Sequence, residues 1–255
     1  MYPNELFWGI DLYQIMIALG FLAALVYFRV LADKAKFSAA LQNICIVAAL
    51  LSLVGGYLSA VLFQAVYNAI KNGRFQIGNG TGSTFYGGLI GGVVTFLAVL
   101  FIGGRLRLPA GEAKREAPHV FNIAIGGVVL AHAFGRIGCL FAGCCHGHVT
   151  EEWFGIWNAD LGARTVPTQL FESLFLFALC AFLTWNELRG KRQNLALYCV
   201  LYGVWRFGIE FIRADDRGKT IVPFLTPSQL IAALLALVGA ALLIRAAVKR
   251  REAHE

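Results

Sequence analysis

The sequence predicts an all-α, polytopic integral membrane protein with about seven transmembrane helices. The composition and the length of the apolar segments both support this fold class. Of the 255 residues, 58% are hydrophobic and 15% are charged, and the mean hydropathy is +0.66. A soluble domain averages about 45–50% apolar and about 25% charged residues, and it has too little interior to hide such an excess. We therefore expect lipid to solvate most of the chain, which excludes disordered, coiled-coil and ordinary cytosolic proteins.

Seven apolar segments approach the roughly 20 residues that a helix needs to cross the hydrocarbon core. They comprise residues 12–31, 41–66, 86–104, 120–142, 168–185, 195–212 and 226–247. The third and fourth are rich in glycine, which lets helix backbones approach closely or lets a helix break around a cavity. No domain boundary or internal repeat is evident, so we expect a single transmembrane domain over residues 1–255.

The basic residues predict the orientation of the chain. Loops on one side of the predicted membrane hold fourteen Lys and Arg, and those on the other side hold six. By the positive-inside rule, the C-terminus is cytoplasmic and the N-terminus is outside. Topology and anionic lipid thus explain the net charge of +7 better than nucleic acid does. Arg136 and Arg206 are the two basic residues left inside predicted spans.

Two longer segments lie on the predicted outer side of the membrane, where a partner could be met. Residues 67–85 are rich in Gly and Asn, and we expect a loop or a short arm there. Residues 144–167 contain Trp153, Phe154 and Trp157, and aromatic residues of this kind are typical of the membrane interface.

Ionisable residues inside spans are costly and mark function by default. In YGVWRFGIEFIR, the spacing of Arg206, Glu210 and Arg213 puts all three on one face of a helix. They either tie two helices together or line a cavity for an anionic headgroup, because a guanidinium can bind phosphate through two parallel hydrogen bonds.

A second buried cation lies in HAFGRIGCLFAGCCHGH, where Arg136 follows Gly135 and precedes Gly138. These glycines would let a substrate or a helix come near the arginine. Two arginines on different spans, with Glu172 and Glu210 as partial counter-charges, would form a phosphate clamp.

Six motifs along the chain carry a family resemblance. They are GIDLYQIMIALGF around Tyr13, FYGGLIGG at 85–92, GRIG at 135–138, PTQLFES at 167–173, YGVWRFGIEFIR at 202–213 and TPSQL at 226–230. Their order, their spacing and the seven-span layout resemble the prolipoprotein diacylglyceryl transferase family over nearly the whole length.

The resemblance implies both a fold and a reaction. An enzyme of this family transfers the diacylglyceryl group of phosphatidylglycerol to the lipobox cysteine of a prolipoprotein and releases glycerol phosphate. The implied partners are therefore phosphatidylglycerol or a similar anionic phospholipid and a prolipoprotein acceptor. The implied place is the outer face of the bacterial cytoplasmic membrane, and no metal or other cofactor is expected.

The resemblance also assigns roles by position. Arg136 and Arg206 would hold the phosphate with support from Glu210 and Arg213, and Tyr13 would line the cavity. Beyond these roles, our further candidates are Gly138, Cys139, Gln169 and Glu172 for substrate binding and Tyr86, His132 and Cys144 for catalysis.

Three positions depart from the family pattern. The His before Gly-Gly is Tyr86, the Asn after GRIG is Cys139, and the acidic residue five positions later is Cys144. A phenol is a poorer base than an imidazole at neutral pH. We therefore expect another base or another acceptor. His132, four residues before Arg136, faces the same side of its helix and is either that base or a simple helix contact.

The cysteine-rich segment allows three interpretations. It contains Cys139, Cys144, Cys145, His146 and His148. The cysteines could be small residues that pack at a cavity mouth. They could instead be reactive or redox thiols activated by Arg136, with a disulfide from Cys139 to Cys144 or Cys145. They could also bind a metal, although the CxxC spacing usual for zinc is missing.

Three other functions remain open alongside the main one. A related membrane enzyme could use a phosphatidylglycerol-like lipid with a different acceptor. A non-catalytic protein could bind the lipid without reacting. A transporter is disfavoured because no inverted repeat is evident.

Overall fold

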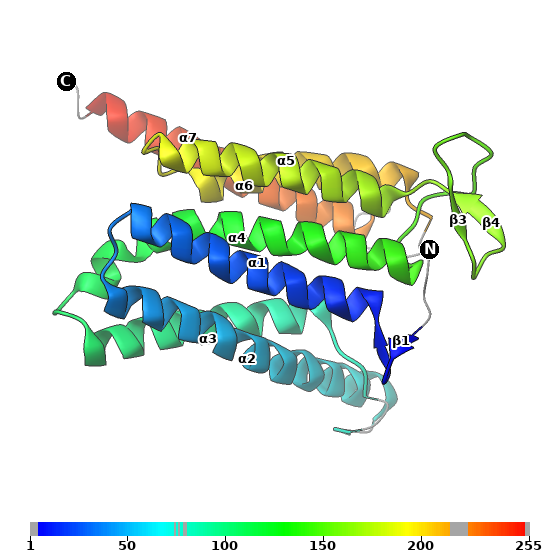
Figure 1. Ribbon diagram of the computed structural model, residues 1–255, viewed down its shortest axis with the longest axis horizontal. Coiled ribbons are helices and arrows are strands. Elements are labelled where there is room, and N and C mark those ends of the chain that lie inside the picture. Colours follow the sequence, from blue (N-terminus) through cyan, green and yellow to red (C-terminus); the bar gives the residue numbers. More distant parts are fainter. Residues whose placement is uncertain (1–4, 74, 76, 79–80, 215–223, 253–255) are drawn as a thin grey trace. The chain divides into compact units, whose positions relative to one another are not determined.

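The computed structural model describes the chain except for residues 1–4, 74, 76, 79–80, 215–223 and 253–255 (Figure 1). Within the described residues, seven helices are long and apolar enough to cross a membrane. The prediction of an all-α polytopic membrane protein with seven helices is therefore confirmed.

Helices make up most of the chain. They are α1 (Leu12–Lys34), α2 (Ala39–Asn72), α3 (Phe85–Arg107), α4 (Glu112–Ala142), α5 (Thr168–Leu188), α6 (Asn194–Ile209) and α7 (Pro227–Glu252), with a 3-10 turn η1 (Glu210–Ile212) after α6. Two short antiparallel hairpins pair β1 (Glu5–Phe7) with β2 (Ile10–Asp11) and β3 (Ile156–Asn158) with β4 (Ala163–Thr165).

The chain forms two compact units. One contains residues 1–28 and 121–255, and the other contains residues 29–120. Helices α1 and α4 each contribute to both units. The prediction of a single transmembrane domain over 1–255 stays a prediction.

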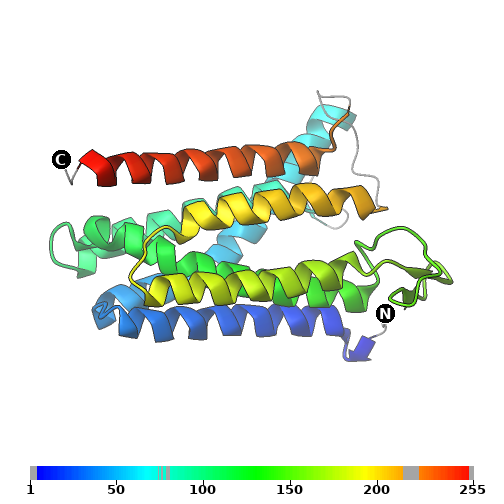
Figure 2. The ribbon, with the colours of Figure 1, turned by 90° about the horizontal axis from the view of Figure 1, so that it is seen from above.

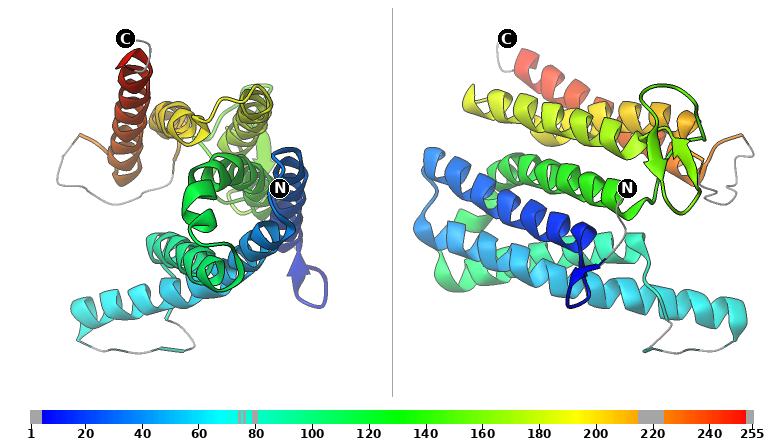
Figure 3. Two further views of the ribbon diagram at one scale, coloured as in Figure 1. Left: turned by 90° about the vertical axis from the view of Figure 1, so that its left-hand side faces the viewer. Right: turned by 45° about the vertical axis from the view of Figure 1, so that its right-hand side comes forward.

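In the unit of residues 29–120, α2 and α3 pack side by side and antiparallel (Figure 3). Glycines on α3 allow this packing, because a Cβ at Gly91 would overlap Ser59 and one at Gly87 would come within 2.7 Å of the Phe63 Cβ. The helix is unbroken. The glycines of the third segment therefore serve close approach, as small residues do in membranes.

In the other unit, α4 and α5 form the apolar core. Val129 and Ala133 of α4 pack with Leu176 and Leu183 of α5, and all four side chains are fully buried. The glycines of α4 also serve close approach rather than a break, because Gly126 leaves room only for the ring of Tyr27 on α1.

Helix α7 packs against α6 in the same unit (Figure 2). A Cβ at Gly203 would lie 2.7 Å from the Ala232 carbonyl oxygen, and one at Gly239 would lie 2.7 Å from the Ala196 carbonyl oxygen. The pairs run in opposite order along the two helices, so the helices are antiparallel. Exposed residues such as Leu237 cover the opposite face of α7, as expected of a lipid-facing helix.

An amide network joins α4, α5 and α6 at the C-terminal end of α5. Asn194 donates its side-chain amide to the carbonyls of Asn122 and Leu183, at 3.2 and 3.0 Å, and Asn186 donates to Asn194 Oδ1 at 2.6 Å. Asn122 also donates to Glu187. Each buried amide is thus satisfied across helices, which fixes their relative position.

Two helices extend beyond the predicted apolar segments. Helix α2 continues to Asn72 and ends at Gly73, whose φ of 69° gives a left-handed cap. The beginning of the predicted loop 67–85 is therefore helical. Helix α4 begins at Glu112, eight residues before the predicted start, because hydropathy does not detect its polar first turns. The acidic Glu112 suits the positive end of the helix dipole.

Residues 144–167 lie outside the helices and contain the β3–β4 hairpin. Trp153 is 87% exposed and Trp157 is 56% exposed, as expected of aromatic residues at a membrane interface.

The α6–α7 contact yields a test of packing. Gly203→Ala should destabilise the protein by about 1–3 kcal/mol because the new methyl group meets the backbone of α7. Gly208→Ala on the same helix is the matched control, since nothing lies within 4 Å of its Cβ position. The control should change stability by less than about 1 kcal/mol, in the stabilising direction. Thermal unfolding in detergent micelles measures both, and equal midpoints for the two variants would contradict the packing argument.

Candidate active site

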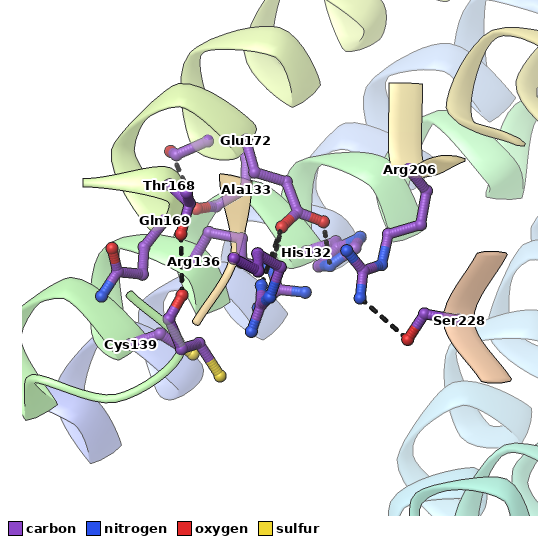
Figure 4. A network of polar contacts seen from close by, with 12 residues as sticks. His132, Ala133, Arg136, Cys139, Thr168, Gln169, Glu172, Arg206 and Ser228 are labelled. Atoms are coloured by element: carbon purple, nitrogen blue, oxygen red, sulfur yellow. Dashed lines mark hydrogen bonds and ion pairs between the residues drawn. The ribbon is translucent and has the colours of Figure 1, made fainter. Parts of the chain in front are cut away.

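The carboxylate of Glu172 lies at the centre of a buried polar cluster. Glu172 sits one turn into α5 and is fully buried. Its Oε2 lies 3.0 Å from Nε of Arg136 on α4 and 3.9 Å from Nη1 of Arg213. Figure 4 shows the carboxylate between Arg136 and His132. Burying this charge costs several kcal/mol, which the neighbouring guanidiniums offset.

The second oxygen of Glu172 is also held. Tyr202 on α6 donates its hydroxyl to Oε1 at 3.0 Å, and His132 Nε2 lies 3.9 Å from the same oxygen. The rings of His132 and Tyr202 meet edge to face with centroids 5.4 Å apart. His132 and Arg136 therefore face the same side of α4, as their spacing predicts.

A second ion pair forms where α6 ends. Arg206 Nη2 lies 2.8 Å from Oε2 of Glu210. The same nitrogen donates to the Ser228 hydroxyl at 3.1 Å (Figure 4). Thr226 donates its hydroxyl to Oε1 of Glu210 at 2.9 Å. The start of α7 therefore helps to hold the carboxylate and guanidinium of α6 and η1.

Arg213 links the two ion pairs. Its Nε lies 4.0 Å from Glu210 Oε2, and its Nη1 faces Glu172. The helix does not continue through this residue, because η1 tightens the chain and Arg213 is extended, with φ −81° and ψ 147°. Arg206, Glu210 and Arg213 thus converge as predicted, although only Arg206 lies on the α-helix.

The ionic groups of this cluster are almost completely buried. Arg206, Arg213, Glu172 and Glu210 are each at most 7% exposed, and the Arg136 side chain is 14% exposed. All three guanidiniums are ion-paired, so this is no clamp of bare cations. However, three guanidiniums face two carboxylates, and Nη1 of Arg206 is buried without a hydrogen-bond partner among the described residues. The Arg206 guanidinium therefore keeps an unused donor where water is scarce, which suits an anionic ligand.

Tyr13 and Gly138 meet at the N-terminal end of α1. A Cβ at Gly138 would lie 3.0 Å from Cδ2 of Tyr13, so the missing side chain lets the Tyr13 ring pack closely against α4. Tyr86 lies in the first turn of α3, within the unit of residues 29–120, and is 47% exposed. The residues that carry the ion pairs all belong to the other unit.

The loop after α4 brings three cysteines together. The sulfur atoms of Cys139, Cys144 and Cys145 all lie within 4.8 Å of one another, and all three are free thiols. Hydrogen bonds from the thiols of Cys139 and Cys144 lower the pKa of the Cys145 thiol, and a hydrogen bond from the Arg213 guanidinium lowers it by a smaller amount. Gln169, a predicted substrate-binding residue, is fully buried and donates its amide to the Cys144 carbonyl at 2.6 Å.

Several residues of the cluster have no role in the sequence-based prediction. Tyr202, Thr226 and Ser228 all lie in the quoted motifs, but their hydroxyls give no signal of their own without knowledge of the helix contacts. Tyr202 stands four residues before Arg206, one helical turn away, and this spacing is the one pattern that points to it.

Comparison with known proteins identifies the family of this chain. Residues 5–245 match the family described as prolipoprotein diacylglyceryl transferase. The chain belongs to this family. The phosphatidylglycerol–prolipoprotein diacylglyceryl transferase of Clostridium tetani is 31% identical over 89% of both chains. A protein named phosphatidylglycerol–prolipoprotein diacylglyceryl transferase 2, from Clostridium perfringens, is 32% identical over 91% of this chain and 88% of its own.

A third relative gives a similar match. The protein of the same name from Coxiella burnetii strain Dugway is 30% identical over 93% of this chain and 89% of its own. These matches confirm the family resemblance and the transferase class, and they make this chain a multi-pass protein of the bacterial inner membrane.

The Glu172 cluster yields a test of stability. Glu172→Gln should lower the free energy of unfolding by about 3–5 kcal/mol, because it leaves buried guanidiniums without their counter-charge. Asp33→Asn is the matched control, since Asp33 forms an exposed pair with Arg29 at 3.5 Å and should cost at most about 1 kcal/mol. Denaturation in detergent micelles measures both. A Glu172→Gln variant as stable as Asp33→Asn would show that the cluster is not held by this carboxylate.

Proposed function

We propose that this protein transfers the diacylglyceryl group of phosphatidylglycerol to the thiol of a prolipoprotein lipobox cysteine. The observation that carries the proposal is the buried group of Arg136, Arg206 and Arg213 against Glu172 and Glu210. Guanidiniums bind phosphate oxygens through charge-assisted hydrogen bonds, and Nη1 of Arg206 has no hydrogen-bond partner among the described residues. The names of the bacterial relatives support the same substrates.

The reaction requires one bond to form and one to break. The acceptor sulfur attacks the glyceryl carbon that carries the phosphate, and a carbon–sulfur bond forms. The carbon–oxygen bond to the phosphate breaks, and the oxygen keeps the electron pair. Glycerol phosphate leaves with a second negative charge, which the proton from the acceptor thiol later neutralises.

The cationic cluster acts on this developing charge. Fixed guanidiniums in a water-poor site stabilise a charge that grows on the leaving phosphate without having to reorganise. In this proposal, Arg136 and Arg206 bind the phosphate oxygens, and the buried Nη1 of Arg206 is one donor for them. Glu172, Glu210 and Arg213 hold those guanidiniums in place, and Tyr13 and Gly138 line the substrate cavity.

The proton of the acceptor thiol needs a destination. His132 is our candidate, because it lies on the same face of α4 as Arg136 and is positioned by Glu172 and Tyr202. Tyr86 takes the place of the family's His, and a phenol is a weak base. This replacement, with those at Cys139 and Cys144, favours a second candidate function in which the same lipid donates to a different thiol.

An activity assay tests the proposal. The purified protein, mixed with phosphatidylglycerol and a lipobox peptide, should release glycerol phosphate and add the diacylglyceryl mass to the peptide. Arg136→Ala and Arg206→Ala should each lower the rate by about 10²–10³-fold, as expected when a donor to a developing anion is lost. The rate of the Arg206→Lys variant should lie between those of the parent and of Arg206→Ala, because lysine keeps the charge but lacks the planar guanidinium.

The exposed Arg245→Ala on α7 is the matched control and should keep full activity. Release of glycerol phosphate without peptide modification would support the different acceptor. Lipid binding that depends on Arg136, with no release at all, would favour a non-catalytic lipid-binding protein and overturn the proposal.

We also propose that the N-terminus is outside and the C-terminus cytoplasmic. An impermeant maleimide should then label a Trp153→Cys variant in intact cells, because residue 153 lies in the predicted outer segment and is exposed. Leu188→Cys, at the exposed C-terminal end of α5, should react only after the membrane is opened. Mass spectrometry separates these thiols from the native ones, and the reverse pattern of labelling would invert the topology.

A further inference from the structure

The cysteine loop is built more firmly than a packing role requires. Gly143 and Cys145 have left-handed backbones, with φ of 73° and 62°. Glycine adopts this conformation readily, but a cysteine does so at a cost in free energy. Cys144 between them is exposed, so it does not fill a core.

Buried side chains hold three successive carbonyls of this loop. Asn158 donates to the Gly143 carbonyl at 3.0 Å, Gln169 to that of Cys144 at 2.6 Å, and Thr168 to that of Cys145 at 2.8 Å. All three donors are at most 1% exposed. The loop is therefore fixed before anything binds, which is how ligand groups for an ion are kept in position.

Three sulfurs at this separation suit a thiophilic cation. A zinc–sulfur bond is about 2.3 Å long, so the sulfurs of a tetrahedral site stand about 3.8 Å apart. The sulfurs of Cys139, Cys144 and Cys145 lie within 4.8 Å of one another, at most about 1 Å farther apart than such a site requires. Sites with three protein ligands keep a fourth position open for a substrate, as catalytic zinc sites do.

The charges around the loop favour the same ligand. Three thiolates and one divalent cation leave a net negative charge that needs a neighbour. Arg213 hydrogen-bonds Cys145, and Arg136 interacts electrostatically with Cys139 and Cys145. Guanidinium groups near metal-bound thiolates offset this charge and orient the ligands, as outer residues of metal sites do.

We propose that Cys139, Cys144 and Cys145 bind a divalent zinc-like cation whose fourth position takes the acceptor thiol. The part concerning the acceptor rests on the proposed function. A thiol bound to such a cation gives up its proton, here to His132 or water. The resulting thiolate attacks the glyceryl carbon, glycerol phosphate leaves with the electron pair and later takes up the proton, and the thioether product dissociates. The cation thus performs the activation for which Tyr86 is a poor base.

Cation binding can be measured without any lipid. The reduced protein, stripped with a chelator and held in detergent, is titrated with Cd²⁺ and with Co²⁺. A single cation per chain should bind with a thiolate-to-metal charge-transfer band, and the Co²⁺ spectrum should be tetrahedral. Cys139→Ala, Cys144→Ala and Cys145→Ala should each weaken binding by about tenfold or more. Cys199→Ala on α6 is the matched control and should bind like the parent.

A second measurement needs no variant. Cd²⁺ should protect Cys139, Cys144 and Cys145 of the unmodified protein from alkylation, while leaving the reactivity of Cys45, Cys180 and Cys199 unchanged. Adding a lipobox peptide should change the Co²⁺ spectrum, and the same peptide with Ser in place of Cys should not. Absence of saturable binding, or binding that survives loss of all three cysteines, would overturn the site. An unchanged Co²⁺ spectrum would overturn the part concerning the acceptor.

The outcomes separate this proposal from the transferase activity. Cation binding without release of glycerol phosphate would keep the site and reject the proposed function. Full activity in a chelator-treated protein that binds no cation would keep the proposed function and reject the cation site. Reversible loss of two thiols on mild oxidation, with no cation bound after reduction, would identify a redox pair and reject the cation site.

Discussion

One buried carboxylate constrains the arrangement of the helices around it. Glu172 is fully buried, and an unpaired ion in that place would be strongly disfavoured. Its partners come from α4, from α6 and from the residue after η1, so those elements must adopt a single register for the charge to be neutralised. The residues that the family resemblance links to phosphate are thus placed by a requirement of folding, and the same contacts stabilise the fold and shape the site.

Helix α5 is fixed by Glu172 near its N-terminal end and by a network of side-chain amides near its C-terminal end. Near its C-terminus, Asn186 joins Asn194 and through it Asn122, so α4, α5 and α6 are fixed there by neutral amides. The buried ion pairs of Glu172 and Glu210 lie at the other end, where a ligand of opposite charge is expected. A site held by elements that are fixed at both ends loses little of its geometry to helix motion, and preorganised cations of this kind are the ones that stabilise a developing charge.

The sequence predicts the seven helices well because lipid enforces long apolar segments, whatever the tertiary contacts are. It also identifies Arg136, Arg206 and Glu172, because charge within such a segment is rare enough to stand out. Tyr202 and Ser228 escape prediction, since a hydroxyl gains a role only when another helix brings a charged group to it. The pairing of both arginines and the left-handed backbone at Cys145 are likewise products of packing that no local pattern encodes.

The start of α5 connects the two sites that we propose. Thr168 and Gln169 hold the cysteine loop, and Glu172, one turn later, holds Arg136. Because a single turn of helix fixes both, a thiol bound at the loop and a phosphate bound at the arginines would be presented to each other at a constant separation. Substitution needs this arrangement, since the attacking sulfur and the leaving oxygen must reach the same carbon together. A chain with Tyr86 in place of the family's His would then activate its acceptor by position and charge, with the nucleophile and the leaving group both oriented from one helix.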